Sequence, residues 1–290
     1  MAISLEKINK VAATKENIAA AIINKGQTIE NGLPFRNYVD KIENIRYPIN
    51  LAESDMTFCG SWETELDLGM FNFENKTNYS CFFALSNLIV GPMIDLSKAT
   101  KMDSMFRECA NLQTIPLYNT KNVEDVGYMF LRCYNLTSLP LLNFKNVKKA
   151  YSFCEYCSNL KEIPMLRLNN CTECSYMFSQ CTSLTNIPAL NLGKAINCQY
   201  FAQGCINLVD IPQLNTKNMQ NCACMFKDCN SLSNSSIHNI INMLLNSKGI
   251  SSSLKNLSTT NNISPFYSTK FNQSYYNNRL TELSTAGWTY

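Results

Sequence analysis

Cysteine is the first residue type in this 290-residue chain that could carry out chemistry, since the chain has 14 cysteines and a single histidine. Three close spacings stand out: C-x-x-C at 154–157, C-x-x-C at 171–174 and C-x-C at 222–224. Such spacings are typical of thiolate metal ligands or of a redox-active dithiol. Zinc sites usually include histidine as well, and His238 lies outside all three pairs.

The positions of the cysteines along the chain favour a structural role instead. Six of them recur every 24 residues: Cys109, Cys133, Cys157, Cys181, Cys205 and Cys229. Others replace hydrophobic residues of the same repeat, because Cys154 stands where other copies have Phe, and Cys171 and Cys174 stand where they have Val or Ala. A free cysteine behaves as a small buried apolar residue. We therefore expect core cysteines in the reduced state, with no metal and no cofactor.

Other residue types recur at the same 24-residue interval, and we call each such series of equivalent positions a column. These columns form the repeat that positions the cysteines. The leucine and isoleucine columns are Leu112, Leu136, Leu160, Leu184, Leu208 and Leu232, and Ile115, Leu139, Ile163, Ile187 and Ile211, the latter column always followed by Pro. This L-x-x-I/L-P-x-L pattern at a period of 20 to 29 residues is typical of a leucine-rich repeat. The sequence predicts an α/β fold: a leucine-rich repeat solenoid of about six to seven coils, with a small helical N-terminal module.

Each coil is expected to contain two kinds of segment. Alternating apolar residues in NLQTIPL and its copies predict a short parallel strand, and NVEDVGYMFLRC and its copies predict a helical or 3₁₀ stretch that closes the coil. The column Asn122, Asn146, Asn170 and Asn218, interrupted by Lys194, predicts a cap or tight turn at the start of that stretch.

The chain is divided into four parts by this pattern. Residues 1–48 predict a helical attachment module, 49–80 transitional strands or an N-terminal cap, 81–235 the solenoid and 236–290 a C-terminal capping region. In the last part, SSIHNIINMLLNSKG has the apolar spacing of a helix that ends before Gly249. LTELSTAGWTY predicts a final helix-turn-strand.

Composition and charge exclude several classes of partner. The net charge is +3 and charged residues are 16% of the chain, so neither a nucleic-acid surface nor an acidic tail is indicated. No apolar run is long enough to span a membrane. The N-terminal residues include Glu6, Lys7 and Lys10, unlike a secretory leader, so we expect a protein made and kept in a cytoplasm.

No catalytic constellation emerges from the sequence. Phosphate-binding glycine loops, G-x-S-x-G and H-E-x-x-H are absent, and His238 has no nucleophile motif to serve as a base. A glycosidase needs a pair of carboxylates, and two candidate pairs leave that alternative open: Glu65 with Asp67, and Glu162 with Asp210. We expect a protein that is not an enzyme.

The exposed residues of each predicted strand form the candidate binding surface. Stacked coils place equivalent side chains about 4.8 Å apart, giving a row of hydroxyls, amides and charges beside an apolar stripe. The predicted ligand face consists of Thr114, Leu117, Ser138, Leu141, Glu162, Met165, Asn186, Asp210 and Gln213. Such a face suits a protein or a glycan, or it is covered by neighbouring subunits.

Two parts of the sequence resemble known families. MFRECANLQTIPLYNTKNVEDVGY, with its M-F-x-x-C-x-N-L and N-T-x-N-V elements, resembles the BspA-like leucine-rich repeats of bacterial surface proteins and phage virion proteins. TKENIAAAIINKGQTIENGLPFRNYVDKI resembles an N-terminal segment of tail and tail-fibre proteins of tailed phages, and the final AGWTY resembles their GWT ending. The repeat departs from the family pattern at Cys154, Ala202 and Ser235-Ser236. These departures affect how many coils the sequence predicts, and not the class of repeat.

The resemblance implies a phage virion structural protein, a tail-fibre or appendage component located in the virion. Its partners would be other virion proteins, bound through residues 1–48, and a host-surface protein or glycan, bound through the repeat face. Association with further copies of the chain is open, and no nucleic acid or membrane insertion is expected. Two other classes remain: a bacterial surface adhesin, disfavoured by the lack of a leader, and a hydrolase of surface glycans.

Overall fold

The computed structural model describes residues 18, 49–50, 58–68, 71–247, 281–282 and 284–286. Its named elements are strand β1 (Ile49–Asn50), strand β2 (Phe71–Asn72) and helix α3 (Asn234–Asn246). β1 and β2 pair in parallel, with Ile49 opposite Phe71. The module predicted for residues 1–48 lies outside the described residues, apart from Ile18, which is helical and fully buried.

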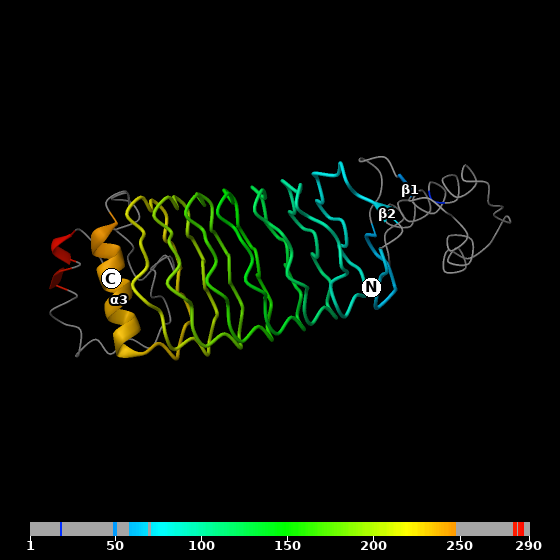
Figure 1. The fold of residues 1–290 in the computed structure, drawn as a ribbon. Coiled ribbons are helices and arrows are strands. Elements are labelled where there is room, and N and C mark those ends of the chain that lie inside the picture. Colours follow the sequence, from blue (N-terminus) through cyan, green and yellow to red (C-terminus); the bar gives the residue numbers. More distant parts are fainter. Residues whose placement is uncertain are drawn as a thin grey trace.

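Between β2 and α3 the chain winds into successive coils that stack along one axis (Figure 1). Isolated parallel bridges join residues 24 apart in neighbouring coils, including Lys101 with Asp125, Asp125 with Lys149, and Lys149 with Glu173. The sequence period is therefore the length of one coil. Assignment of these coils to the leucine-rich repeat class stays a prediction.

The most regular backbone contact between coils lies in residues 102–109 and their copies, which we call the turn segments. Within 102–109, four amides donate to carbonyls of the next coil: Met102 to Asp125, Ser104 to Gly127, Phe106 to Met129 and Glu108 to Leu131, at 2.7–2.9 Å. The amides of Met105, Arg107 and Cys109 donate instead to carbonyls three residues back. Alternate amides thus bond between coils and within the coil.

The predicted helical or 3₁₀ stretch is therefore wrong, because the turn segments are made of consecutive tight turns. Ser104 and Glu108 have φ of 57° and 60°, and they occupy the third positions of turns closed by the Met105 and Cys109 amides. This left-handed conformation is the one that a type II turn requires at that position. A helix would direct these amides to carbonyls four residues back and leave the next coil unpaired.

The predicted strands in NLQTIPL and its copies are not formed as regular strands. Few backbone bonds join neighbouring coils there, such as Thr137 N to Gln113 O at 3.1 Å and Lys161 N to Thr137 O at 3.3 Å. The longest set joins the coils at 185–187 and 209–210, where Val209 N donates to Thr185 O at 2.8 Å and Ile187 N donates to Asp210 O at 3.1 Å. The proline in each copy has no amide hydrogen to extend the ladder, so pairing stops at a bridge.

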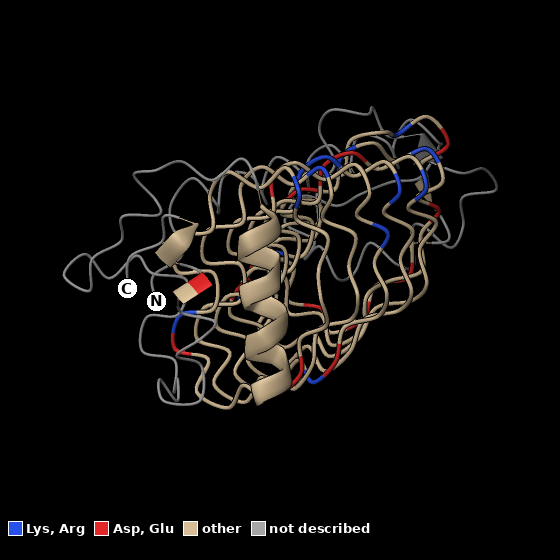
Figure 2. Ribbon diagram, turned by 90° about the vertical axis from the view of Figure 1, so that its left-hand side faces the viewer, with Lys and Arg blue, Asp and Glu red and all other residues tan. Residues whose placement is uncertain are grey.

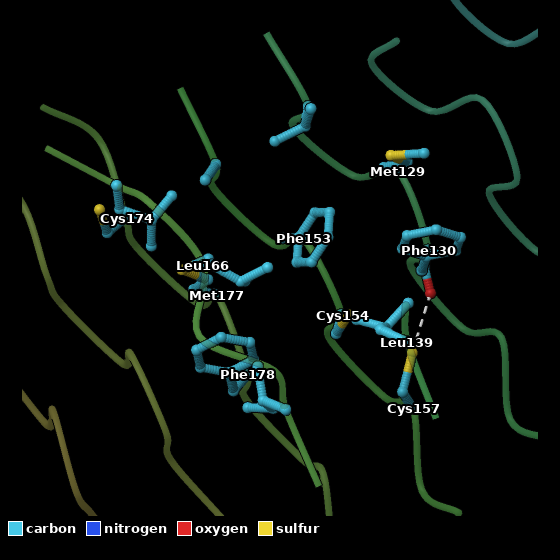
Figure 3. Packing of buried hydrophobic residues seen from close by; sticks show 14 of the residues in the cluster. Met129, Phe130, Leu139, Phe153, Cys154, Cys157, Leu166, Cys174, Met177 and Phe178 are labelled. Atoms are coloured by element: carbon cyan, nitrogen blue, oxygen red, sulfur yellow. Dashed lines mark hydrogen bonds between the residues drawn. The ribbon is translucent and has the colours of Figure 1, made fainter. Parts of the chain in front are cut away.

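The core is one continuous column of side chains inside the coils (Figure 3). Phe130 and Phe178 are fully buried, and so is Phe153, which stands at the position of Met129 and Met177 in the repeat. The Phe130 and Phe153 rings meet edge to face, with centroids 5.3 Å apart. Cys154 takes the place of a phenylalanine in that coil and is also fully buried.

The cysteine column adds hydrogen bonds to this packing. All six cysteines of the column are fully buried and free. Cys157 Sγ donates to the carbonyl of Phe130 at 3.1 Å, as Figure 3 shows, and Cys181 Sγ donates to that of Cys154 at 3.1 Å. The Phe130 carbonyl also accepts the Cys133 amide at 3.0 Å, so both of its lone pairs are used.

The asparagine column lies in a tight turn, one of the two predictions made for it, and it bonds between coils instead of capping a helix. The side-chain amide of Asn122 donates to the Ser97 carbonyl at 2.7 Å, and that of Asn146 to the Lys121 carbonyl at 2.8 Å. Where Lys194 interrupts the column, its Nζ donates to Asn170 Oδ1 at 2.7 Å. The asparagine side chains thus donate to a backbone carbonyl of the preceding coil, and Lys194 donates to the asparagine side chain of the preceding coil.

Helix α3 covers the last coil, as predicted for SSIHNIINMLLNSKG. Ser233 is the N-cap, with its side chain accepting the Ser236 amide at 3.2 Å. The apolar face of α3, which includes the buried residues Ile237, Ile240, Ile241 and Leu244, belongs to the core. Ser236 Oγ donates to the Val209 carbonyl and accepts the Ile211 amide, both at 2.8 Å, so the helix satisfies the backbone of the final coil.

At the other end, coil-to-coil bonding begins inside the segment predicted as transitional. Phe58 N donates to Phe82 O at 2.7 Å, and Gly60 N donates to Ala84 O at 2.8 Å. Phe58 packs edge to face against Phe71 of β2 and against Phe82. The stack therefore extends upstream to Phe58, before the predicted start of the solenoid at residue 81.

Candidate binding face

The L-x-x-I-P-x-L segment positions the candidate face. Leu112 and Ile115 are buried, whereas Thr114 and Leu117 between and beyond them point outwards and are exposed. The next residue, Tyr118, is buried again, and its hydroxyl donates to the Pro92 carbonyl of the preceding coil at 2.9 Å. Burial raises the pKa of Tyr118, so the phenol remains a neutral donor. The exposed residues are thus held between buried anchors.

An apolar stripe runs along this face, one residue per coil. Met93, Leu117, Leu141 and Met165 are exposed by 76%, 69%, 63% and 48%. The same column continues with Ala189 and Gln213, both exposed. Apolar side chains that are exposed singly are common on protein surfaces, but a contiguous series on neighbouring coils is typical of an interaction site.

A polar row accompanies the stripe three residues earlier in each coil. Thr114, Glu162, Asn186 and Asp210 are exposed, and Ser138 is half-buried. Parallel bridges join Val90 to Thr114 and Asn186 to Asp210, which places these residues on adjacent coils. The structure therefore brings all nine predicted residues to one edge of the stack, in register, rather than scattering them.

The sequence prediction missed the first members of both rows. Met93 is the most exposed residue of the stripe, and Val90, 41% exposed, begins the polar row with an apolar side chain. Counting back 24 residues from Leu117 and Thr114 gives these two positions, so the signal was present in the period itself. At Met93 the stripe borders a hollow lined also by Phe71, Phe73 and Lys98.

Carboxylates on the face are separated along the stack. Glu162 and Asp210 lie two coils apart, because Asn186 of the intervening coil is bridged to Asp210. Within the described residues, no three of His, Cys, Asp or Glu are grouped as metal ligands. The described helices include none long and apolar enough to cross a membrane. What the face offers chemically is contact: apolar surface next to hydroxyl, amide and carboxylate groups.

The cysteine pairs considered as sites are placed in the core. Cys171 Sγ and Cys174 Sγ are 3.0 Å apart and both residues are buried. Burial raises the pKa of Cys109 to about 11 and that of Cys205 to about 12. Desolvation also raises the pKa of Cys154 and Cys181. Thiols held in the neutral form are poor nucleophiles and poor metal ligands.

Comparison with known proteins gives one match. Residues 53–166 and 146–282 match a family described as "Mycoplasma protein of unknown function, DUF285". The two matched ranges overlap in the middle of the stack and together include every coil and α3. No curated protein and no solved structure matches the chain.

Proposed function

The chain belongs to the DUF285 family, and we propose that this repeat protein is a binding component of a phage virion, with its coils of the leucine-rich repeat class. It would act by contact and not as an enzyme. The observation that carries the binding role is the stripe of Met93, Leu117, Leu141 and Met165, exposed on four adjacent coils.

The architecture supports a binding role because the face is rigid. Every coil interface carries several backbone hydrogen bonds in the turn segments and a row of thiol donors in the core. The exposed side chains therefore keep a fixed spacing, so a ligand that binds along the stack meets a preorganised surface. A host-surface protein or a glycan are the ligands that a mixed apolar and polar row suits best.

The virion assignment draws its support from the resemblances at the two ends of the sequence. TKENIAAAIINKGQTIENGLPFRNYVDKI resembles a segment of phage tail and tail-fibre proteins, and AGWTY resembles the ending of phage repeat proteins. In this proposal residues 1–48 attach the protein to other virion proteins, and the repeat face meets the host surface. Self-association within the particle is compatible with the same arrangement.

Purified particles provide the test. We expect the full-length protein in phage particles by mass spectrometry and on a tail or appendage by immunogold labelling. A deletion of residues 1–48 should abolish incorporation. A variant carrying Leu117→Ser, Leu141→Ser and Met165→Ser should incorporate normally but adsorb to the host less well.

A matched control is Lys161→Ser, Thr185→Ser and Gln113→Ser, which changes exposed residues next to the polar row but leaves the apolar stripe intact. This variant should adsorb like the unmodified phage. Incorporation without residues 1–48, or loss of assembly in the stripe variant, would contradict the proposed division of roles.

A bacterial cell-surface repeat protein is the second candidate. The family's description names a protein of a bacterium, Mycoplasma, which favours a bacterial over a phage origin. Protease treatment of intact bacteria that produce the protein distinguishes the two candidates. A surface protein would be cleaved from intact cells and absent from particles, whereas a virion component would be protected inside cells until lysis.

A further inference from the structure

A second surface of the stack is formed by a two-residue turn that recurs in every coil on the side of the asparagine column. We call it the basic edge, and it comprises residues 95–101 and the equivalent ranges 119–125, 143–149, 167–173, 191–197 and 215–221. In the coil of residues 143–149 the backbone of this edge is fixed at two points. Asn143 Oδ1 accepts the Lys145 amide at 3.3 Å, and the Asn146 side-chain amide donates to the Lys121 carbonyl at 2.8 Å.

Each of these turns presents at least one positive charge to solvent. One exposed residue from each successive coil lies at or next to the turn: Lys98, Lys121, Lys145, Arg167, Lys194 and Lys217. Lys101, Lys148 and Lys149 are exposed further along the same ranges. Where Asn169 takes the lysine position of the repeat, Arg167 of the same coil supplies the charge. With coils about 4.8 Å apart, the six charges form a row about 24 Å long, which we call the single file. Lys121, Lys145 and Lys217 share one repeat position, whereas Lys98 and Lys194 stand one position later and Arg167 two positions earlier.

Charge is concentrated on this edge rather than spread over the molecule. The six ranges of the basic edge contain nine Lys or Arg and four Asp or Glu, a net charge of +5, although the whole chain has a net charge of only +3. Lys and Arg recur in successive coils of the stack (Figure 2). The remainder of the protein is therefore slightly acidic.

The charges of the single file are not neutralised by neighbouring carboxylates. Within the described part of the chain, the ion pairs of this region join Lys148 to Glu124 at 2.7 Å and Lys149 to Asp125 at 3.4 Å. They occupy two of the carboxylates and leave the six residues of the file without an ion pair. The Lys194 ammonium donates to an amide oxygen, which leaves its charge intact.

We propose that the basic edge binds a linear phosphate polymer lacking bases, laid along the stack with phosphate groups facing successive coils. A single row of positive charges suits a single chain of phosphate groups. Duplex DNA instead presents two strands, with one charge per about 1.7 Å of axis. Single-stranded nucleic acids are held by aromatic side chains on which the bases stack. The only aromatic residue within the six ranges, Phe144, is fully buried, so the edge offers phosphate contacts alone.

This surface meets the apolar stripe at its first coil, where Lys98 and Met93 line the same hollow. The proposal does not depend on whether the protein belongs to a virion. The test uses the full-length protein and inorganic polyphosphate, with binding measured by isothermal titration calorimetry at several salt concentrations. Release of counterions from six contacts predicts that the logarithm of the association constant falls with the logarithm of salt concentration with a slope of about −4.

A triple variant, Lys98→Gln, Lys121→Gln and Lys145→Gln, removes half of the file. Its slope should fall to about −2 and its affinity should drop about 100-fold at 0.1 M salt, because three counterion-release contacts are lost. The control is Arg107→Gln, Arg132→Gln and Lys161→Gln, which removes the same charge from exposed positions outside the basic edge. It should bind polyphosphate within about twofold of the unmodified protein.

Three results would overturn the proposal. These are no binding of polyphosphate, an equal loss of affinity in both triple variants, or equally tight binding of a single-stranded oligodeoxynucleotide of matched charge. The last result would indicate a nucleic-acid partner. Because all six substitutions are on exposed side chains, unchanged thermal unfolding confirms that both variants retain the fold.

Discussion

Replacement of Phe178 by alanine tests the core directly. Phe178 is fully buried and its ring meets Phe201 of the next coil edge to face, with centroids 5.3 Å apart. Its backbone contacts survive the substitution, because the Phe178 amide donates to Phe201 O at 2.8 Å and its carbonyl accepts Cys205 Sγ at 3.1 Å. The change therefore isolates the contribution of the side chain.

The expected cost is about 3–5 kcal/mol in the free energy of unfolding, which is typical of truncating a packed core phenylalanine. The upper part of this range is favoured, since the ring contact with Phe201 adds about 0.5–1.5 kcal/mol beyond the buried area. Phe178→Leu keeps most of the volume and should cost about 1–2 kcal/mol, which provides a folded variant if the alanine variant is too unstable.

Urea denaturation followed by circular dichroism measures these differences, with comparable m-values for all variants. Thr185→Ala is the matched control, because Thr185 is exposed and its backbone amide remains in contact with Lys161 O at 3.4 Å. It should change stability by less than about 0.5 kcal/mol. Equal costs for Phe178→Ala and Thr185→Ala would show that the assignment of inward and outward residues is wrong.

Three further predictions concern the cysteine and asparagine columns. Reaction of the native protein with a thiol reagent should modify the exposed Cys81 and, more slowly, Cys59, whereas the 12 buried cysteines react only after denaturation; native disulfides or bound zinc would contradict the core assignment. Because burial raises the pKa of Cys109 to about 11 and of Cys205 to about 12, the folded protein holds protons that the unfolded chain loses above pH 9. The contribution of these two thiols to stability should thus be constant below pH 8 and fall from pH 9 towards pH 12, by up to about 1.4 kcal/mol per pH unit for each thiol, in thermal unfolding series. Asn146→Ala should cost about 1–2 kcal/mol in urea denaturation, because the Lys121 carbonyl loses its 2.8 Å donor, and Asn146→Asp should be no better, since a carboxylate cannot donate that bond.

The period of 24 residues and the inward positions could be predicted from the sequence alone. Cys109 and its copies, Leu112 and Ile115 recur without a gap, and a residue that meets its own copy in the next coil must be buried or exposed in all coils alike. Helix α3 could also be predicted, because the apolar residues in 237–245 follow the spacing of one helix face, which is a local pattern. The members of the ligand face followed from the period as well.

Tertiary structure alone decided the path of the backbone within each coil. Ser104 and Glu108 adopt positive φ although they are not glycine, and their residue types do not predict this conformation. The conformation depends on the next coil, because the Ser104 and Glu108 amides donate to the carbonyls of Gly127 and Leu131 there. The local pattern at Asn146 predicts a cap or a tight turn, and the tight turn forms, but its side-chain amide also donates to a carbonyl 25 residues away. Local patterns identify which residues are buried, whereas these hydrogen bonds exist only once neighbouring coils are stacked.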